Sequence, residues 1–109
     1  MRYIIYTFMK VTIKESTKPD KKMMAIFTRE NGRNKTVHFG AIKKDGQPYD
    51  DYTITHNKEQ RAKYINRHQS KENFNSPMTA GSLSRWILWG DSTSKTTNIK
   101  NFKSKFGFT

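Results

Sequence analysis

The fold is organised around one stretch, Thr79-Ala80-Gly81-Ser82-Leu83-Ser84-Arg85-Trp86-Ile87-Leu88-Trp89-Gly90, which holds both tryptophans and the densest apolar block of the chain. Leu83, Trp86 and Ile87 follow the i, i+3, i+4 spacing of an amphipathic helix. Ser76 or Thr79 can cap this helix, and Gly90 can end it. Because the helix is apolar around most of its circumference, we expect it to be the buried core helix. The alternative is that a tryptophan serves as a stacking platform for nucleic-acid bases.

The first 42 residues have the pattern of β-strands. Residues 2–14 are rich in β-branched and aromatic side chains, and their second half alternates apolar with polar residues. Residues 22–29 and 35–42 form two further apolar segments, and Asn31-Gly32 between them predicts a hairpin. Gly40, inside the third segment, predicts a bulge or the close approach of another backbone.

Helical patterns follow the strands. Asn57, with Gln60 three residues later, predicts the start of a helix over residues 58–71. A last helix, ending near Gly107, is predicted from three apolar residues at helical spacing, Ile99, Phe102 and Phe106. The sequence therefore predicts an α+β fold, in which an N-terminal three-stranded, mainly antiparallel sheet is followed by three helices packed on one face.

The length of 109 residues predicts a single domain, with the sheet in residues 1–42 and the helical part in residues 57–107. The chain has no cysteine, which excludes disulfides and thiolate metal sites. No apolar run approaches the roughly 18 residues of a membrane span, and no signal-peptide pattern is present, so we expect neither a transmembrane segment nor secretion. The expected core draws on both parts of the domain: Phe39, Tyr64, Leu83, Trp86, Ile87 and Phe102.

Positive charge is the strongest global feature. The chain has 21 lysines and arginines against 9 acidic residues, a formal net charge of +12. The excess is spread along the sequence, with +6 in residues 1–50, +2 in residues 51–91 and +4 in residues 92–109. A folded basic surface is therefore expected, and such a surface attracts polyanions.

Basic residues recur beside aromatic ones in three segments, which are the candidate nucleic-acid-binding sites. In the predicted hairpin they are Arg29, Arg33 and Lys35. In the predicted helix over residues 58–71 they are Arg61, Lys63, Arg67 and Lys71. In the last helix they are Lys100 and Lys103, with Lys105 beside them. Such lysine-rich surfaces favour contact with phosphates without the reading of bases.

Catalytic or metal-binding chemistry has weaker support. His38, His56 and His68 lie 18 and 12 residues apart, so no two of them have the local spacing of a zinc site. One set of residues could converge in space as in a small nuclease: Asp51, His56, Arg61, His68 and Glu72. We expect these side chains to pair with one another and fix the helices, and we predict no catalytic residue, no metal ion and no cofactor.

Several short motifs between residues 35 and 106 point to a family. They are Val37-His38-Phe39-Gly40, Asp51-Tyr52-Thr53 with His56, Arg61, Tyr64, Arg67-His68, Glu72-Asn73 and the stretch from Thr79 to Trp89. With them the chain resembles a family of small, uncharacterised basic proteins encoded by large double-stranded DNA viruses of algae and amoebae. The resemblance implies a viral protein located in the virion or in the cytoplasm or nucleus of the infected host cell. It implies no activity, and residues 1–30 carry none of these motifs.

The sequence as a whole predicts a non-enzymatic protein that binds nucleic acid, DNA or RNA, without sequence preference. The first alternative is a virion structural protein, such as a minor capsid protein, whose basic surface docks acidic capsid or membrane partners. The second alternative is a small metal-dependent nuclease. Both leading interpretations depend on the same charge, so composition alone does not separate them.

Overall fold

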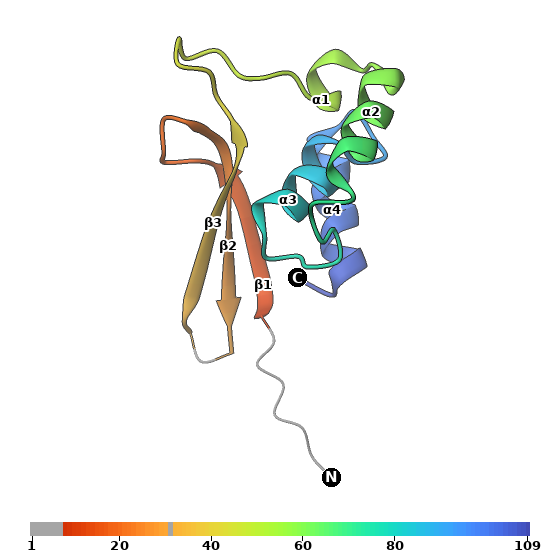
Figure 1. Ribbon diagram of the computed structural model, residues 1–109. Coiled ribbons are helices and arrows are strands. Elements are labelled where there is room, and N and C mark those ends of the chain that lie inside the picture. Colours follow the sequence, from red (N-terminus) through yellow and green to blue (C-terminus); the bar gives the residue numbers. More distant parts are fainter. Residues whose placement is uncertain (1–7, 31) are drawn as a thin grey trace.

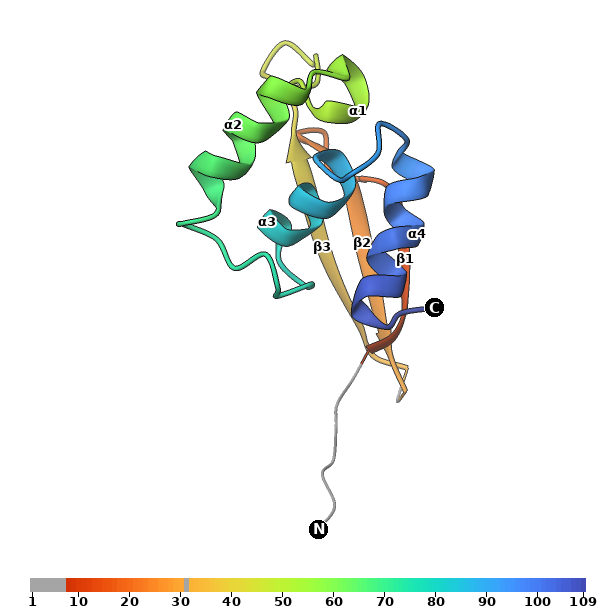
Figure 2. The same cartoon turned by 90° about the vertical axis from the view of Figure 1, so that its right-hand side faces the viewer.

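The computed structural model describes residues 8–30 and 32–109, so the predicted strand segment 2–7 lies outside the described residues. Three strands, β1 (Phe8–Glu15), β2 (Lys21–Arg29) and β3 (Asn34–Ala41), form an antiparallel sheet in the order β1-β2-β3. The helices all lie on one face of this sheet (Figures 1 and 2). The predicted α+β class and antiparallel sheet are confirmed.

The register of the strands explains which side chains are buried. Val11 is paired with Phe27, and Phe27 with Lys35, so alternate residues of the strands point toward the helices. Val11 and Phe27 are fully buried, whereas Lys10, Thr12 and Lys14 are exposed on the opposite face. The period-2 pattern that predicted a half-buried strand is therefore confirmed.

Two glycines shape the second hairpin. Gly32 has a φ of +82° and lies in the turn that Arg29 and Arg33 close through a backbone hydrogen bond of 2.9 Å. Gly40 has a φ of +79°, and a Cβ there would lie 2.9 Å from Leu88 Cδ1. The predicted hairpin is confirmed, whereas the atoms that approach Gly40 closely belong to the side chains of Leu88 and Lys22 and not, as predicted, to another backbone.

The helical part begins earlier than its pattern indicates. A one-turn helix, α1 (Tyr52–Thr55), precedes α2 (Lys58–His68), and Asp51 caps α1 by accepting a hydrogen bond from Thr53 N. The expected cap of α2 is present, because the Asn57 side chain accepts from Gln60 N. However, α2 ends at His68, three residues before the predicted end at Lys71.

The tryptophan stretch forms two consecutive pieces. Thr79 caps α3 (Ala80–Leu83), which continues as the π-helical turn η1 (Ser84–Leu88). The π turn is closed by Trp89 N, which donates to Ser84 O over 2.9 Å. The last helix, α4 (Lys95–Phe106), is capped by Ser94 and ends at Gly107 in the left-handed conformation.

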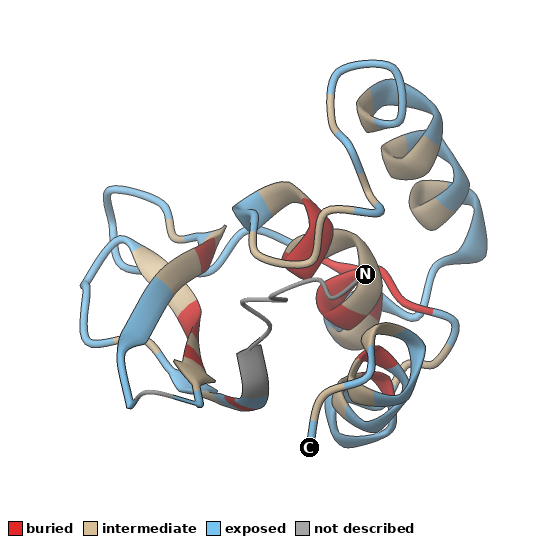
Figure 3. Cartoon of the chain, turned by 90° about the horizontal axis from the view of Figure 1, so that it is seen from below, coloured by how far each residue is buried: buried red, intermediate tan, exposed pale blue. Residues whose placement is uncertain are grey.

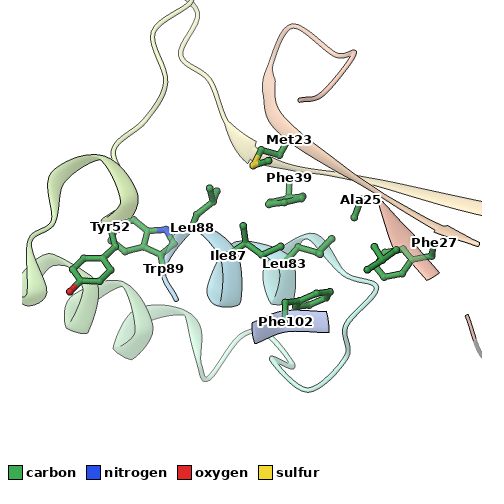
Figure 4. Close-up of a cluster of buried hydrophobic side chains, with 11 residues drawn as sticks. Met23, Ala25, Phe27, Phe39, Tyr52, Leu83, Ile87, Leu88, Trp89 and Phe102 are labelled. Carbon is green, nitrogen blue, oxygen red and sulfur yellow. The ribbon is translucent and has the colours of Figure 1, made fainter. Parts of the chain in front are cut away.

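The core lies between the sheet and the α3–η1 segment, with α4 beside them (Figure 3). Leu83, Ile87, Phe39 and Phe102 are buried as predicted. Trp86 and Tyr64 are only partly buried, and Trp89, 7% exposed, takes the buried position in place of Trp86. Figure 4 shows Tyr52 and Trp89 at one end of this core and Phe27 at the other.

The C-terminal residues complete the packing. Phe108 lies 5.4 Å from Phe27 and 6.0 Å from Phe102 between ring centroids. Thr109 O accepts a hydrogen bond from Val11 N at the free edge of β1. In the described part of the chain, no helix is long and apolar enough to cross a membrane.

Candidate functional site

The candidate basic residues lie in three separate places. Arg29, Arg33 and Lys35 gather at the tip of the β2–β3 hairpin, because the register brings the end of β2 next to the start of β3. The tip and α2 lie at opposite ends of the molecule in both side views (Figures 1 and 2). Lys100 and Lys103 lie on α4, on the other side of α3 from α2 (Figure 2). The nine predicted residues therefore do not form one continuous surface.

The basic residues in and just after α2 differ in their exposure and in their contacts. Lys63 and Arg67 are exposed, lie one turn apart and have no ion-pair partner among the described residues. Lys71 is exposed too, but it follows the end of α2 in a turn, so its predicted position on the same helical face is wrong.

The Arg61 side chain binds other groups of the same protein. Its Nε donates to Trp89 O and to Gly90 O, and its Nη2 lies 2.7 Å from Asp91 Oδ1. The side chain therefore fixes α2 to the end of η1. Because these contacts occupy its guanidinium, Arg61 is not part of the candidate interface.

A cleft of about 340 Å³ opens between the end of β3, the loop before α1, α2 and η1. Its aromatic lining consists of Tyr49, Tyr64 and Trp89. Gly40 and Leu88 also line the cleft, and they lie so close together that a side chain at Gly40 would collide with Leu88. Its charged lining consists of Lys22, Asp50, Asp51 and Arg67, and the His68 ring lies beside them. The cleft thus combines aromatic rings with both signs of charge, as small-molecule sites do.

A buried ion pair forms the sheet side of the cleft. Lys22 Nζ lies 2.7 Å from Asp51 Oδ2, and the two side chains are 9% and 1% exposed. Lys22 also donates to Tyr49 O, while Asp51 Oδ1 accepts from Thr53 N and Thr53 Oγ1. These bonds hold the loop before α1 against the sheet.

Three stacked rings form the helix side of the cleft. Tyr64 stacks on Trp89 with 4.3 Å between centroids and on His68 with 4.2 Å. Burial, reinforced by the nearby Glu72 carboxylate, raises the pKa of Tyr64 to about 12, although a hydrogen bond with Ser84 acts in the opposite direction. Tyr64 is therefore neutral at physiological pH and serves as a fixed ring.

The five residues that could have formed a nuclease-like cluster lie apart, and of them only His68 and Glu72 pair with one another as expected. Asp51 binds Lys22, Arg61 binds Asp91, and His68 Nδ1 lies 3.6 Å from Glu72 Oε1. His56 is exposed and contacts Thr53 O, and His38 hydrogen-bonds Ser16 on the open face of the sheet. Within residues 8–30 and 32–109, no group of three or more potential ligands could hold a metal ion.

Sequence reasoning did not find most of the cleft. Lys22 and Tyr49 carry no motif, and Trp89 was expected in the core helix, with a tryptophan stacking platform as the alternative. The sequence also gives no signal that Lys22 is buried and needs a partner for its charge, because neighbouring residues of a strand point to opposite faces and the lysine beside Met23 is expected to be exposed. The partner, Asp51, lies 29 residues away, so spacing could not identify it.

No curated protein and no solved structure matches the chain. One family model, described as a family of unknown function (DUF5754), matches residues 11–68. The match spans most of the sheet, from residue 11 of β1, together with α1 and α2. It includes nine of the residues that line the cleft: Lys22, Gly40, Ala41, Tyr49, Asp50, Asp51, Tyr64, Arg67 and His68. Since this region is more than half of the chain, the protein belongs to the DUF5754 family.

Proposed function

We propose that the protein is a non-enzymatic nucleic-acid-binding protein that contacts phosphates without sequence preference, with the exposed side of α2 as its main contact surface. Lys63 and Arg67 provide the helical part of this surface and Lys71 extends it into the following turn. The hairpin tip and α4 supply secondary contacts. The resemblance described above adds the further proposal that this binding takes place in a virion or an infected cell.

The observation that carries the proposal is that most acidic side chains near the helices form ion pairs, whereas several basic side chains do not. Three of the five acidic residues after residue 49, Asp51, Asp91 and Glu72, each face a basic side chain of the same protein, whereas Asp50 and Glu59 are exposed. Lys63, Arg67 and Lys71 remain exposed without an acidic partner among the described residues. In residues 58–71 five lysines and arginines outnumber one acidic residue, Glu59, so a net positive potential remains around α2, where it can attract phosphates.

The test is a titration of duplex DNA, single-stranded DNA and RNA at several salt concentrations around about 150 mM. The double variant Lys63→Glu/Arg67→Glu should lower the affinity for every sequence alike. It should also reduce the slope of log K against log salt by about 2, since each lost phosphate contact contributes about 0.9 on duplex.

The chain offers a matched control on the open face of the sheet. Lys10→Glu/Lys14→Glu lowers the net charge from +12 to +8, as the α2 variant does, at two exposed residues far from the helices. This control should leave the salt slope unchanged. Equal losses in both variants would show that only the overall charge matters, and would overturn the assignment to α2.

The same measurement addresses the virion structural alternative. No binding tighter than about 100 µM at about 150 mM salt, the weak end of non-specific affinity, would refute the proposed function. If the protein were then found in the shell of purified virions, the basic surface would be assigned to acidic capsid or membrane partners.

A further inference from the structure

We propose that the cleft beside α2 binds one nucleotide of a single strand, with its phosphate at Arg67 and its base against Tyr49. This inference rests on the proposed function and makes it more specific. Phosphate contacts along α2 would bind duplex and single strands alike, whereas an occupied cleft requires an unpaired base.

The size and lining of the cleft support a nucleotide-sized occupant. Its volume of about 340 Å³ lies at the lower end of the range for small-molecule sites. Tyr49 is 52% exposed, so its ring is accessible for stacking, and Lys43 Nζ lies 5.5 Å from the ring centroid. An exposed aromatic ring next to a cation is a common platform for bases in single strands.

The charges that remain available in the cleft are complementary to a nucleotide. Lys22 and Asp51 neutralise one another, which leaves Arg67 and Asp50, both exposed and without an ion-pair or hydrogen-bond partner in the described part of the chain. The Arg67 guanidinium can bind a phosphate with two parallel hydrogen bonds. The Asp50 carboxylate can accept hydrogen bonds from the amino or imino groups of a base, groups that are paired in a duplex.

Arg67 connects the cleft to the surface proposed above. It lines the cleft and also lies one helical turn after Lys63 on the exposed side of α2. A strand that runs along α2 would therefore bring a phosphate to the mouth of the cleft. The same position favours a polyanion over a small zwitterion, because the excess positive charge of α2 continues beyond the cleft.

The experiment is an amide NMR titration of the whole protein with adenosine 5′-monophosphate, adenosine and inorganic phosphate. The nucleotide should shift the signals of Gly40, Asp51 and Arg67, and these shifts should reach a plateau as the site saturates. Adenosine and phosphate should shift the same signals more weakly. Equal responses to phosphate and nucleotide would identify an adventitious anion site, and scattered shifts without saturation would show non-specific attraction; either result overturns the proposal.

Two variants assign the contacts. Arg67→Gln should remove the preference for the nucleotide over adenosine. Tyr49→Ala should lower the affinity for both ligands. Lys58→Gln is the matched control, because it removes the same charge at the start of α2 and outside the cleft. It should leave the affinity for both ligands unchanged. A Lys58→Gln effect as large as that of Arg67→Gln would refute a specific phosphate contact.

Binding to single-stranded and duplex nucleic acid distinguishes this inference from the proposed function. Tyr49→Ala should lower the affinity for a short single-stranded oligodeoxyadenylate about tenfold, within the range for loss of one stacked base, and should leave duplex binding unchanged. If duplex and single strands lose affinity only in the Lys63→Glu/Arg67→Glu variant, the cleft proposal fails while nucleic-acid binding stands. If no polymer binds, both fail.

Discussion

Asn98 joins the last helix to the end of the π turn. Its side chain is buried, and its Nδ2 donates to Ile87 O over 2.9 Å and to Ser92 O over 2.7 Å. Its Oδ1 accepts from Ser92 N. The amide thus satisfies a carbonyl at the end of η1 that has no helical partner. Gly90 leaves room for this contact, since a Cβ there would lie 2.7 Å from Asn98 Cγ.

The substitution Asn98→Asp should therefore be costly although it preserves the shape. A carboxylate would face two carbonyl oxygens, and a buried polar group left in that state costs about 3 kcal/mol or more. Urea denaturation measures the loss of unfolding free energy. Asn101→Asp, one turn along on the exposed side of α4, is the control with the same change of charge and should cost little.

The pH dependence gives a second readout for Asn98→Asp. Burial and the two carbonyls raise the folded-state pKa of the introduced carboxyl above its unfolded value of about 4. The penalty is then small below about pH 4 and grows as the pH rises toward the folded-state pKa. A loss that is equally large at low and neutral pH would contradict this electrostatic explanation.

At the scale of elements, the fit between the sheet and η1 depends on Gly40. The π turn presents Leu88 toward β3, and a Cβ at Gly40 would lie 2.9 Å from Leu88 Cδ1 and 3.0 Å from Lys22 Cβ. The strand must also adopt a φ of +79° at this point. Two separate demands, backbone conformation and close packing, therefore select glycine.

Gly40→Ala and Gly46→Ala separate these two demands. Both glycines have a positive φ, +79° and +88°, but a Cβ at Gly46 meets nothing within 4 Å. Both variants should lose stability through backbone strain, and Gly40→Ala should lose at least about 1 kcal/mol more through overpacking. Thermal or urea unfolding measures the difference. Equal losses would mean that Leu88 moves aside without cost.

Sequence patterns predicted the elements better than their ends. The alternation of Val11 and Ile13 with lysine and threonine identified β1, and Asn57 identified the start of α2, because these signals are local. The end of α2 was wrong, since the basic pattern continues through Lys71 although the backbone turns after His68. The π turn was not predicted, because the same residues fit a regular α-helix.

The candidate site was the least predictable part. Exposed lysines and arginines could be identified from composition, but their three separate locations could not. Arg61 seemed part of a basic surface, yet it binds two backbone carbonyls and Asp91, some 28 to 30 residues away. The cleft is formed by five separate segments, so only the tertiary structure brings Tyr49 near Arg67.

At the scale of the whole molecule, a net charge of +12 acts on stability and on binding in opposite ways. Excess positive charge repels itself in the folded state and destabilises it. The same charge attracts phosphates, and each neutralised phosphate releases counterions. Two ion pairs, Lys22–Asp51 and Arg61–Asp91, oppose the repulsion locally, and the first is shielded from solvent.

Added salt should therefore raise the melting temperature while it weakens binding to nucleic acid. From about 20 mM to about 500 mM NaCl the Debye length falls severalfold, which screens the repulsion between exposed lysines. The buried Lys22–Asp51 pair is screened much less, so repulsion should dominate the response. The control is Lys10→Glu/Lys14→Glu, whose net charge of +8 should make its melting temperature less sensitive to salt. A melting temperature that falls with salt would show instead that local ion pairs outweigh the global repulsion.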